Sequence, residues 1–485
     1  MKSFSLVVLV LCAVVALPLA AFPASPEIFL ADEPEIYLLI DKLEGYGLLP
    51  GLMTDDRGLE AREVAREAVK AVDVEDPFAE GMLQFLRLEG TPRMDFRLRA
   101  GFEDSRHGEI SPNSQGLPIQ KDWAFRLGGF FRDAPTDWLA LQARGDYVTG
   151  GKDGRRTGRI EETSVRIGWP QGTLEAGRFS LWWGPGRHGS LLFTTNAEPL
   201  IGTRLRNPRP IPVGGWFRFL GLFQYDLFLS RLEKDRPIPH PYLAGMRLAL
   251  KPKPWLEIGA SRAMHFGGEG RSVTSSTLID TFTGKGENDP NGAGNQLASF
   301  DAKVRLPLRG QPVVLYMEGG AEDHSSGWKP SKWAWLGGIF LPSIGGEKRF
   351  DFRLEFADTY DSAHGTGIWY RHLASGEGYA HAYKGQVLGH HLGTDARDFF
   401  AEAHYFILPA SYLEINADLT QRFFPGPARE ETRRFGAGLV LWLSKSLRNE
   451  TRFSVRKVSN ENGVPGMDGT DSTFQLMMAY QYRGF

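Results

Sequence analysis

The chain has 485 residues and a formal net charge of −2, and no part of it forms a basic face, which argues against nucleic acid as a partner. Its 57 glycines and 12% aromatic residues suit many short strands joined by turns better than they suit a helical enzyme. A chain of this length can hold two or three domains, or one large barrel.

Residues 1–21 have the pattern of a secretory signal peptide. Met1-Lys2 gives a short positive start, Leu6–Ala16 is an apolar centre, and Ala20-Ala21 supplies small residues for cleavage. A retained transmembrane helix is the alternative, because the uncharged run is long enough to span, but three prolines weaken that interpretation. The single cysteine, Cys12, lies in this segment, so the exported chain is expected to have no disulfide, cysteine metal site or cysteine nucleophile.

Residues 22–92 are predicted to form a periplasmic helical bundle. Apolar residues recur at helical spacing over 36–43 and 59–72, and Pro77 can begin a third helix. Three short helices bury only a thin core by themselves, so we expect them to dock on something larger, with a structural or plug role.

Over residues 93–485 the period of the apolar residues changes to 2, as in β-strands. Segments such as 94–102, 217–229, 300–306 and 350–356 alternate apolar residues with polar ones, including charges of both signs. A soluble sandwich also alternates, but a water-filled interior wrapped by lipid explains both faces at once. We therefore predict an all-β, antiparallel transmembrane barrel of about eighteen strands, with about sixteen as the alternative.

A barrel of this kind belongs in the outer membrane of a Gram-negative cell, with its N-terminal helices in the periplasm. The last strand ends in Phe485, which is similar to the terminal signal read by the barrel-assembly machinery, although it is one position out of phase with Tyr482. Two long connections, 264–299 and 358–398, are expected on the outer side, because barrels keep short turns on the periplasmic side.

The stretch 177–200, GRFSLWWGPGRHGSLLFTTNAEPL, combines a predicted hairpin with groups suited to sugar recognition. Gathered around its Gly-Pro-Gly turn are Trp182, Trp183, Arg187, His188 and Asn196. Aromatic faces cover the apolar side of a pyranose, while arginine and amide groups bind hydroxyls and carboxylates. Two alternatives stay open: the tryptophans form an aromatic girdle at the lipid boundary, or arginine and asparagine side chains lock the hairpin into the barrel interior.

The chain resembles the Wzi-type capsule-assembly family in three motifs, which are the stretch 177–200, RLRNPRP at 204–210 and YKGQVLGHHLGTDARDFF at 383–400. The combination of WWGPG with the downstream N-A-x-P is specific. The resemblance implies an outer-membrane barrel with a small periplasmic helical bundle, acting as a lectin that holds capsular polysaccharide on the cell surface. The 264–299 loop and the histidine-rich loop have no counterpart in this resemblance.

The sequence predicts neither an enzyme nor a cofactor. No G-x-S-x-G nucleophile motif occurs, and the acidic cluster at 287–291 lacks the pattern of a calcium loop. The histidines that suggest a metal site are His364, His372, His381, His390, His391 and His404. None belongs to a helical i, i+4 pair, and His390 and His391 would point to opposite faces of a strand, so we expect no metal site.

We therefore predict a non-enzymatic, monomeric outer-membrane lectin. Its expected partners are capsular polysaccharide or exopolysaccharide, outer-membrane lipid and the barrel-assembly machinery. The predicted ligand contacts are Trp182, Trp183, Arg187, His188, Asn196, Arg204, Arg206, Trp369, Tyr370, His391 and Asp395. The arginines suit acidic sugars. The alternative is a porin or export channel for small solutes or saccharides, which differs in whether the bore is open.

Overall fold

The computed structural model describes residues 29, 33–71, 74–151, 154–283, 294–308, 310–325, 329–360, 369–373, 376–424 and 428–484. The predicted signal peptide, the acidic cluster at 287–291, His364 and Phe485 lie outside the described residues.

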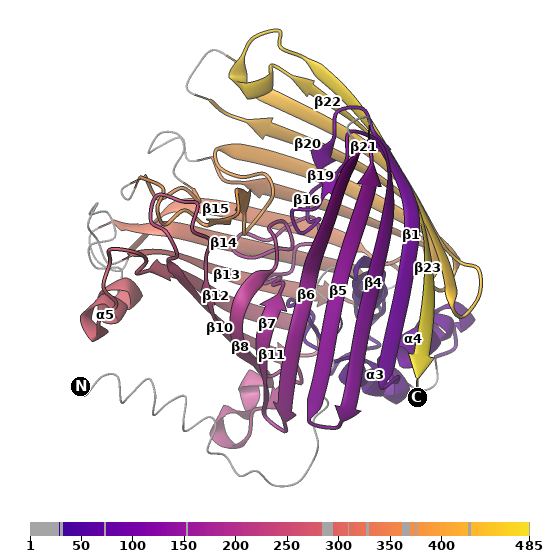
Figure 1. Ribbon diagram of the computed structural model, residues 1–485. Coiled ribbons are helices and arrows are strands. Elements are labelled where there is room, and N and C mark those ends of the chain that lie inside the picture. Colours follow the sequence, from indigo (N-terminus) through magenta and orange to yellow (C-terminus); the bar gives the residue numbers. More distant parts are fainter. Residues whose placement is uncertain are drawn as a thin grey trace.

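The wall of the molecule is one closed antiparallel barrel (Figure 1). Its strands are β1 (Met94–Ser105), β4 (Asp122–Thr136), β5 (Leu139–Gly150), β6 (Arg155–Trp169), β7 (Gly172–Phe179), β8 (Leu200–Arg206), β10 (Leu222–Arg231), β11 (Tyr242–Lys253), β12 (Leu256–Phe266), β13 (Gly294–Leu306), β14 (Val313–Ser325), β15 (Lys329–Leu341), β16 (Phe350–Asp358), β19 (Ala396–Leu408), β20 (Ser411–Arg422), β21 (Glu430–Trp442), β22 (Leu447–Ser459) and β23 (Gly469–Gly484). The pairing of β1 with β23 closes the barrel, and the two-residue strand β9 (Ile211–Pro212) extends the edge that β8 presents to β10. The prediction of eighteen strands is confirmed in the described part of the chain.

The strands turn their apolar side chains outward and their charged side chains inward. Leu98, Phe300 and Phe435 are 51%, 62% and 62% exposed, whereas Asp95 and Arg247 are both 1% exposed. This arrangement is the reverse of that in a soluble protein, which buries its apolar side chains. It is the arrangement expected of a barrel wall that faces lipid outside and has a polar interior. The predicted alternation is therefore confirmed.

The two ends of the barrel differ. The connections at one end are 137–138, 170–171, 207–221, 254–255, 307–312, 342–349, 409–410 and 443–446, most of them short. The long connections at the other end are 106–121, 180–199, 232–241, 267–293 and 359–395. Some long connections contain short elements, which are the pair β2 (Glu109–Ile110) and β3 (Pro118–Ile119), the pair β17 (Ala382–Tyr383) and β18 (Gln386–Val387), and the helix α5 (Ser275–Thr283). The connections at 267–293 and 359–395 lie at the end that the sequence predicts to be the outer one.

Three helices close the end with the short turns. They are α2 (Pro34–Gly45), α3 (Ala61–Lys70) and α4 (Pro77–Gly90), and Figure 1 shows α3 and α4 beside the C-terminal end of the chain. Proline begins α2 and α4, where its missing N–H costs nothing, and Asp76 caps α4 by accepting from two backbone N–H groups. Among the described residues, no helix has both the length and the apolar character needed to cross a bilayer.

The helices share one core with the barrel interior. Their apolar faces pack against Phe406, Tyr412 and Val440 on the barrel wall, and Phe85 meets Trp442 edge to face at 5.4 Å between ring centroids. The expectation that these helices dock on something larger is confirmed, because a bundle this thin gains most of its buried apolar area from its neighbour.

One predicted strand is wrong in its first half. Residues Gly215–Leu220 form a 3-10 helix, η1, and β10 begins only at Leu222. Gly215 and Gly221 adopt φ values of +64° and +72°, which interrupt an extended run. Trp216 in η1 is 95% exposed, at the level of the short turns, where tryptophans mark a lipid boundary.

Candidate functional site

The connection between β7 and β8 folds into the barrel instead of closing as a hairpin, so the predicted hairpin is wrong beyond Phe179. We call residues 180–199 the inner segment. Within it Trp183 is fully buried, its backbone N–H donates to the Phe193 carbonyl at 3.1 Å, and its Nε1 donates to Asp226 Oδ2 at 3.0 Å. Trp182 is also buried, so the girdle interpretation of these two tryptophans is wrong. The course of the inner segment is therefore determined by contacts with residues far away in the sequence, such as Asp226 on β10.

Two glycines of the WWGPGRHG motif are required by close approach. Gly184 has φ +127°, and a Cβ there would lie 2.7 Å from Ser190 Oγ. At Gly189 a Cβ would lie 2.1 Å from the His390 ring. These glycines of the motif are therefore needed so that the inner segment can pack closely against neighbouring side chains inside the barrel.

A second inward segment, described over 369–373 and 376–395, packs on the inner segment. Tyr370 Oη donates to the Leu191 carbonyl at 2.6 Å, and Asn196 Nδ2 donates to the Val387 carbonyl at 3.0 Å. Arg204 on β8, whose Nε donates to Asp226 Oδ1 at 2.9 Å, donates from Nη1 to the Ser180 carbonyl of the inner segment at 3.4 Å. The alternative in which arginine and asparagine lock this region into the interior is therefore confirmed. We call this stretch the second segment.

A cavity of about 430 Å³ lies inside the barrel between the inner segment and the wall formed by β19 to β23. The polar and aromatic side chains that line it include Arg57, Asn113, Trp182, Arg187, His188, Phe400, Glu402, Glu414, Asn416, Asp418, Arg434, Glu450, Arg452 and Gln475. Aromatic, amide, cationic and anionic groups thus share one concave surface, as small-molecule sites do.

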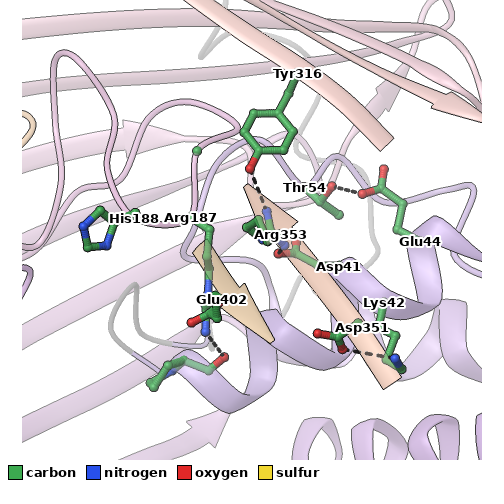
Figure 2. Close-up of polar contacts among 12 residues, drawn as sticks. Asp41, Lys42, Glu44, Thr54, Arg187, His188, Tyr316, Asp351, Arg353 and Glu402 are labelled. Carbon is green, nitrogen blue, oxygen red and sulfur yellow. Dashed lines mark hydrogen bonds and ion pairs between the residues drawn. The ribbon is translucent and has the colours of Figure 1, made fainter. Parts of the chain in front are cut away.

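Arg187 is one of the inner-segment residues that line this cavity. Its backbone N–H and that of His188 donate to the two oxygens of Glu355 at 2.5 and 2.9 Å, which fixes the turn. Its Nη2 donates to the Pro34 carbonyl at 3.2 Å, and Glu402 lies 4.0 Å from its Nε (Figure 2). Its Nη1 is buried and has no hydrogen-bond partner among the described residues.

Arg57, from the loop before α3, lies against the same corner. Its guanidinium carbon is 3.5 Å from the centroid of the Trp182 ring, and its Nη2 donates to the Arg187 carbonyl at 3.4 Å. Burial, together with the neighbouring Arg187 cation, lowers the pKa of Arg57 to about 9. A ligand oxygen that carries partial or full negative charge would offset the repulsion between the Arg57 and Arg187 cations.

His188 lies on the opposite side of the turn. Its ring stacks on Phe400 at 3.7 Å between centroids, and its Nε2 lies 3.5 Å from Asp398 Oδ2 and 3.6 Å from Asp418 Oδ2. Burial opposes charging of the ring, but these facing carboxylates raise the pKa of His188 to about 9.

Buried ion pairs attach the helices to the barrel interior (Figure 2). Lys42 Nζ lies 3.0 Å from Asp351 Oδ2, and Arg353 Nη2 donates to Asp41 Oδ2 at 2.8 Å. Lys303 Nζ lies 2.9 Å from Glu44 Oε2. Luminal charges on these strands therefore meet opposite charges on the helices, while other luminal charges pair between neighbouring strands, as Arg166 does with Glu175.

The structure brings three of the predicted ligand residues to the cavity, namely Trp182, Arg187 and His188. The others do not line it: Trp183, Asn196, Arg204, Arg206, Trp369 and Tyr370 are buried in packing, and His391 and Asp395 belong to the second segment. His390 and His391 are not on a strand, so the prediction that they point to opposite faces is wrong; their rings lie 4.5 Å apart at 28°.

Sequence reasoning missed the wall of the cavity. Glu402, Glu414, Asn416, Arg434 and Arg452 are luminal positions on β19 to β22. The alternation of apolar and polar residues predicts that each of them faces inward. It predicts the same for the luminal charges of the other strands, so it cannot single out the residues that line the cavity.

Comparisons with known proteins agree with this architecture. The family model of capsule assembly protein Wzi matches residues 98–473. A Klebsiella pneumoniae protein, described as an uncharacterized 55.8 kDa protein in the cps region, is 36% identical over 277 residues, which are 55% of this chain and 53% of that protein. The chain thus spans about half the length of that curated relative.

The structure of Escherichia coli Wzi, described as an outer membrane protein involved in group 1 capsule assembly and as a carbohydrate binding β-barrel, is similar with a TM-score of 0.75 at 22% identity. The similarity covers 93% of this chain and 98% of that chain, which shows the shared fold. Because the family model matches most of its length, this chain belongs to the Wzi family of capsule assembly proteins and is an outer-membrane β-barrel of that type.

Proposed function

We propose that this barrel is a non-enzymatic lectin that binds capsular polysaccharide or exopolysaccharide and helps to assemble or anchor it at the cell surface. Membership of the Wzi family supports the role in capsule assembly. The fold shared with a carbohydrate binding barrel, together with the luminal cavity beside the inner segment, supports saccharide as the ligand.

The observation that carries the proposal is the unpaired donor of Arg187. Its side chain is 10% exposed, it lines the cavity, and its Nη1 has no partner in the described chain. A buried donor without an acceptor costs about 1–3 kcal/mol, which a ligand oxygen recovers. Sugar hydroxyl and carboxylate oxygens are such acceptors, and the arrangement of Arg187 beside Trp182 suits them.

The charges of the cavity narrow the choice of sugar. Arg434 pairs with Glu109 at 3.2 Å, and Arg452 Nη1 lies 3.7 Å from Glu414. These arginines already have anionic partners, so they do not form a general acidic-sugar site. We infer that one acidic or strongly polar group binds at Arg187, while hydroxyl groups meet the remaining wall.

The inward segments favour a lectin over an open channel. The inner segment and the second segment share one apolar core that includes Leu191, Phe193, Trp369 and Leu392 inside the barrel. The helices pack into the opposite end. We place these helices, within residues 22–92, in the periplasm, with residues 1–21 as a cleaved signal peptide, 93–485 as the outer-membrane barrel, and the long connections outside.

The test is binding of the purified, detergent-held barrel to the capsular polysaccharide or exopolysaccharide of its own organism, measured by surface plasmon resonance. Arg187→Gln removes the charged donor and should weaken saturable binding about 10- to 100-fold, as expected for loss of a charge-assisted hydrogen bond of about 1.5–3 kcal/mol. Arg93→Gln is the matched control, because Arg93 is half-exposed at the short-turn end and pairs only with Asp137 among the described residues.

Trp182 and Trp183 are unsuitable for this test, because both are buried and alanine at either position would create a cavity. Equal binding by the wild type and Arg187→Gln would remove Arg187 from the site. Absence of saturable binding by the wild type, combined with steady single-channel current in a planar bilayer, would replace the lectin by the channel.

A further inference from the structure

Two histidines and two aspartates turn their ligand atoms toward one point beside the cavity. His188 comes from the inner segment, His391 from the second segment, Asp398 from β19 and Asp418 from β20. One ring nitrogen of each histidine and one carboxylate oxygen of each aspartate lie within 4.8 Å of one another. We call this group the His–Asp cluster. It is assembled only by the fold, because His188 is about 200 residues away in the sequence from the other three members.

The spacing within the cluster fits a shared cation better than direct hydrogen bonds. His188 Nε2 lies 3.5 Å from Asp398 Oδ2 and 3.6 Å from Asp418 Oδ2, beyond the usual range for an N–H···O bond. Ligands bound to zinc at about 2.0–2.2 Å in a tetrahedral arrangement are separated by about 3.4 Å. The three atoms are therefore already close to the separation of ligands around one metal ion.

The histidine nitrogens of the cluster are poorly satisfied. Both ring nitrogens of His391 are buried without a hydrogen-bond partner among the described residues, and His188 Nε2 meets the two carboxylates only at 3.5 and 3.6 Å. In the same part of the chain, His188 is the only basic side chain paired with either Asp398 or Asp418. Buried polar atoms in native proteins are almost always satisfied, so this arrangement indicates a missing ligand.

We propose that His188, His391, Asp398 and Asp418 form a binding site for one divalent cation of the zinc class. Imidazole nitrogens favour zinc and its neighbours, whereas calcium and magnesium prefer sites made only of oxygen. Metal binding displaces the proton that the carboxylates hold on His188. Two neutral imidazoles and two carboxylates then balance the charge of one such ion. A shift of the His391 ring toward the other three groups completes the four ligands.

The metal would join the two inward segments to the barrel wall. His188 and Asp418 also line the cavity, so the ion would hold that side of the cavity in place. Metal binding of this kind adds its free energy to the stability of the folded state. The site does not depend on the proposed polysaccharide and can be tested without it.

A second group of close ligand atoms, Glu402, His404 and Glu414, serves as a comparison. His404 Nδ1 lies 2.8 Å from Asp351 Oδ1, and Glu414 lies 3.7 Å from Arg452. His404 and Glu414 thus already have protein partners, a hydrogen bond with Asp351 and an ion pair with Arg452. We therefore assign the metal to the His–Asp cluster.

The experiment uses the full barrel, purified in detergent, treated with a chelator and then titrated with Zn²⁺ by calorimetry, with metal content measured by elemental analysis. We expect one Zn²⁺ per chain. His391→Gln and Asp398→Asn should each weaken Zn²⁺ binding by about 100-fold or more, because each removes one ligand. His404→Gln and His240→Gln, the latter in a loop at the long-connection end, should bind Zn²⁺ like the wild type. Heat-modifiable gel mobility verifies that each variant is a folded barrel.

The proposal fails if the wild type takes up no Zn²⁺ above background, or if folded Asp398→Asn binds as tightly as the wild type. It also fails if His404→Gln abolishes binding while His391→Gln retains it, because the metal would then occupy the other group. If His391→Gln does not fold, the wild-type titration and Asp398→Asn decide the question.

Discussion

Replacing Lys42 by methionine tests whether buried ion pairs hold the helices in the barrel. Lys42 is fully buried on α2, where its Nζ donates to the Pro342 carbonyl at 2.6 Å and to Asp351 Oδ2 at 3.0 Å. Methionine retains most of the aliphatic volume but removes the charge and both hydrogen bonds. Asp351 then keeps only the hydrogen bond with His404.

The magnitude follows from the burial. Removing one partner of a buried ion pair costs about 3–5 kcal/mol, because the other charge stays behind without compensation. His404 still contacts Asp351, so we expect the lower end, roughly 3 kcal/mol, for Lys42→Met. If the helices detach as a unit, this loss raises the population of the detached state by about 100-fold. Lys42→Met combined with Asp351→Asn should recover part of the loss, because the unpaired carboxylate is gone.

Cleavage of the detergent-held barrel by a glutamate-specific protease measures detachment, since neither substitution changes a cleavage site. The cleavage rate within residues 33–92 should rise about 100-fold in Lys42→Met when reattachment is faster than cleavage. Lys70→Met is the control, because Lys70 lies on α3 with 60% of its side chain exposed and an ion pair with Glu67. Cleavage of Lys42→Met at the wild-type rate would refute the reasoning, as would an equal increase in the Lys70→Met control.

Three further outcomes are expected. Gly189→Ala should displace the His390 ring, which lies 2.1 Å from the new Cβ, and should weaken polysaccharide binding while the barrel still migrates as a folded species. Arg204→Met should lower the thermal unfolding temperature by leaving Asp226 unpaired in the interior, and a variant as stable as the wild type would contradict this structural role. Burial raises the pKa of Glu60 to about 7, although its ion pair with Arg209 opposes that shift, so protonation of Glu60 favours the docked helices. Docking should therefore weaken as the pH rises from 4.5 to 7, by on the order of 3 kcal/mol at most. Cleavage by a protease that does not cut at glutamate should lack that part of the pH dependence in Glu60→Gln.

The architecture was predictable because it depends on patterns local in the sequence. Alternation along segments such as 300–306 follows from the pleat of a strand, and the lipid and the polar interior then select its two faces. Pro34 and Pro77 begin helices at positions where proline is favourable. The strand predicted at 217–221 was misassigned because glycines with positive φ permitted a 3-10 turn in an alternating run.

The site was predictable only in part. The WWGPGRHG motif identified the inner segment, but whether that segment forms a hairpin tip or folds inward depends on Asp226 and Glu355, which lie on other strands. The motif residues that look like ligand contacts, such as Trp183 and Arg204, proved to be the groups that hold this path.

The sequence by itself determined the wall, the helical preface and the family, because periodicity, proline positions and a contiguous motif are local properties. Only the tertiary structure decided which charges line the cavity and which four side chains meet at the His–Asp cluster. Closing the barrel brings the luminal faces of β19 to β23 opposite the inner segment, and no local pattern records that distance.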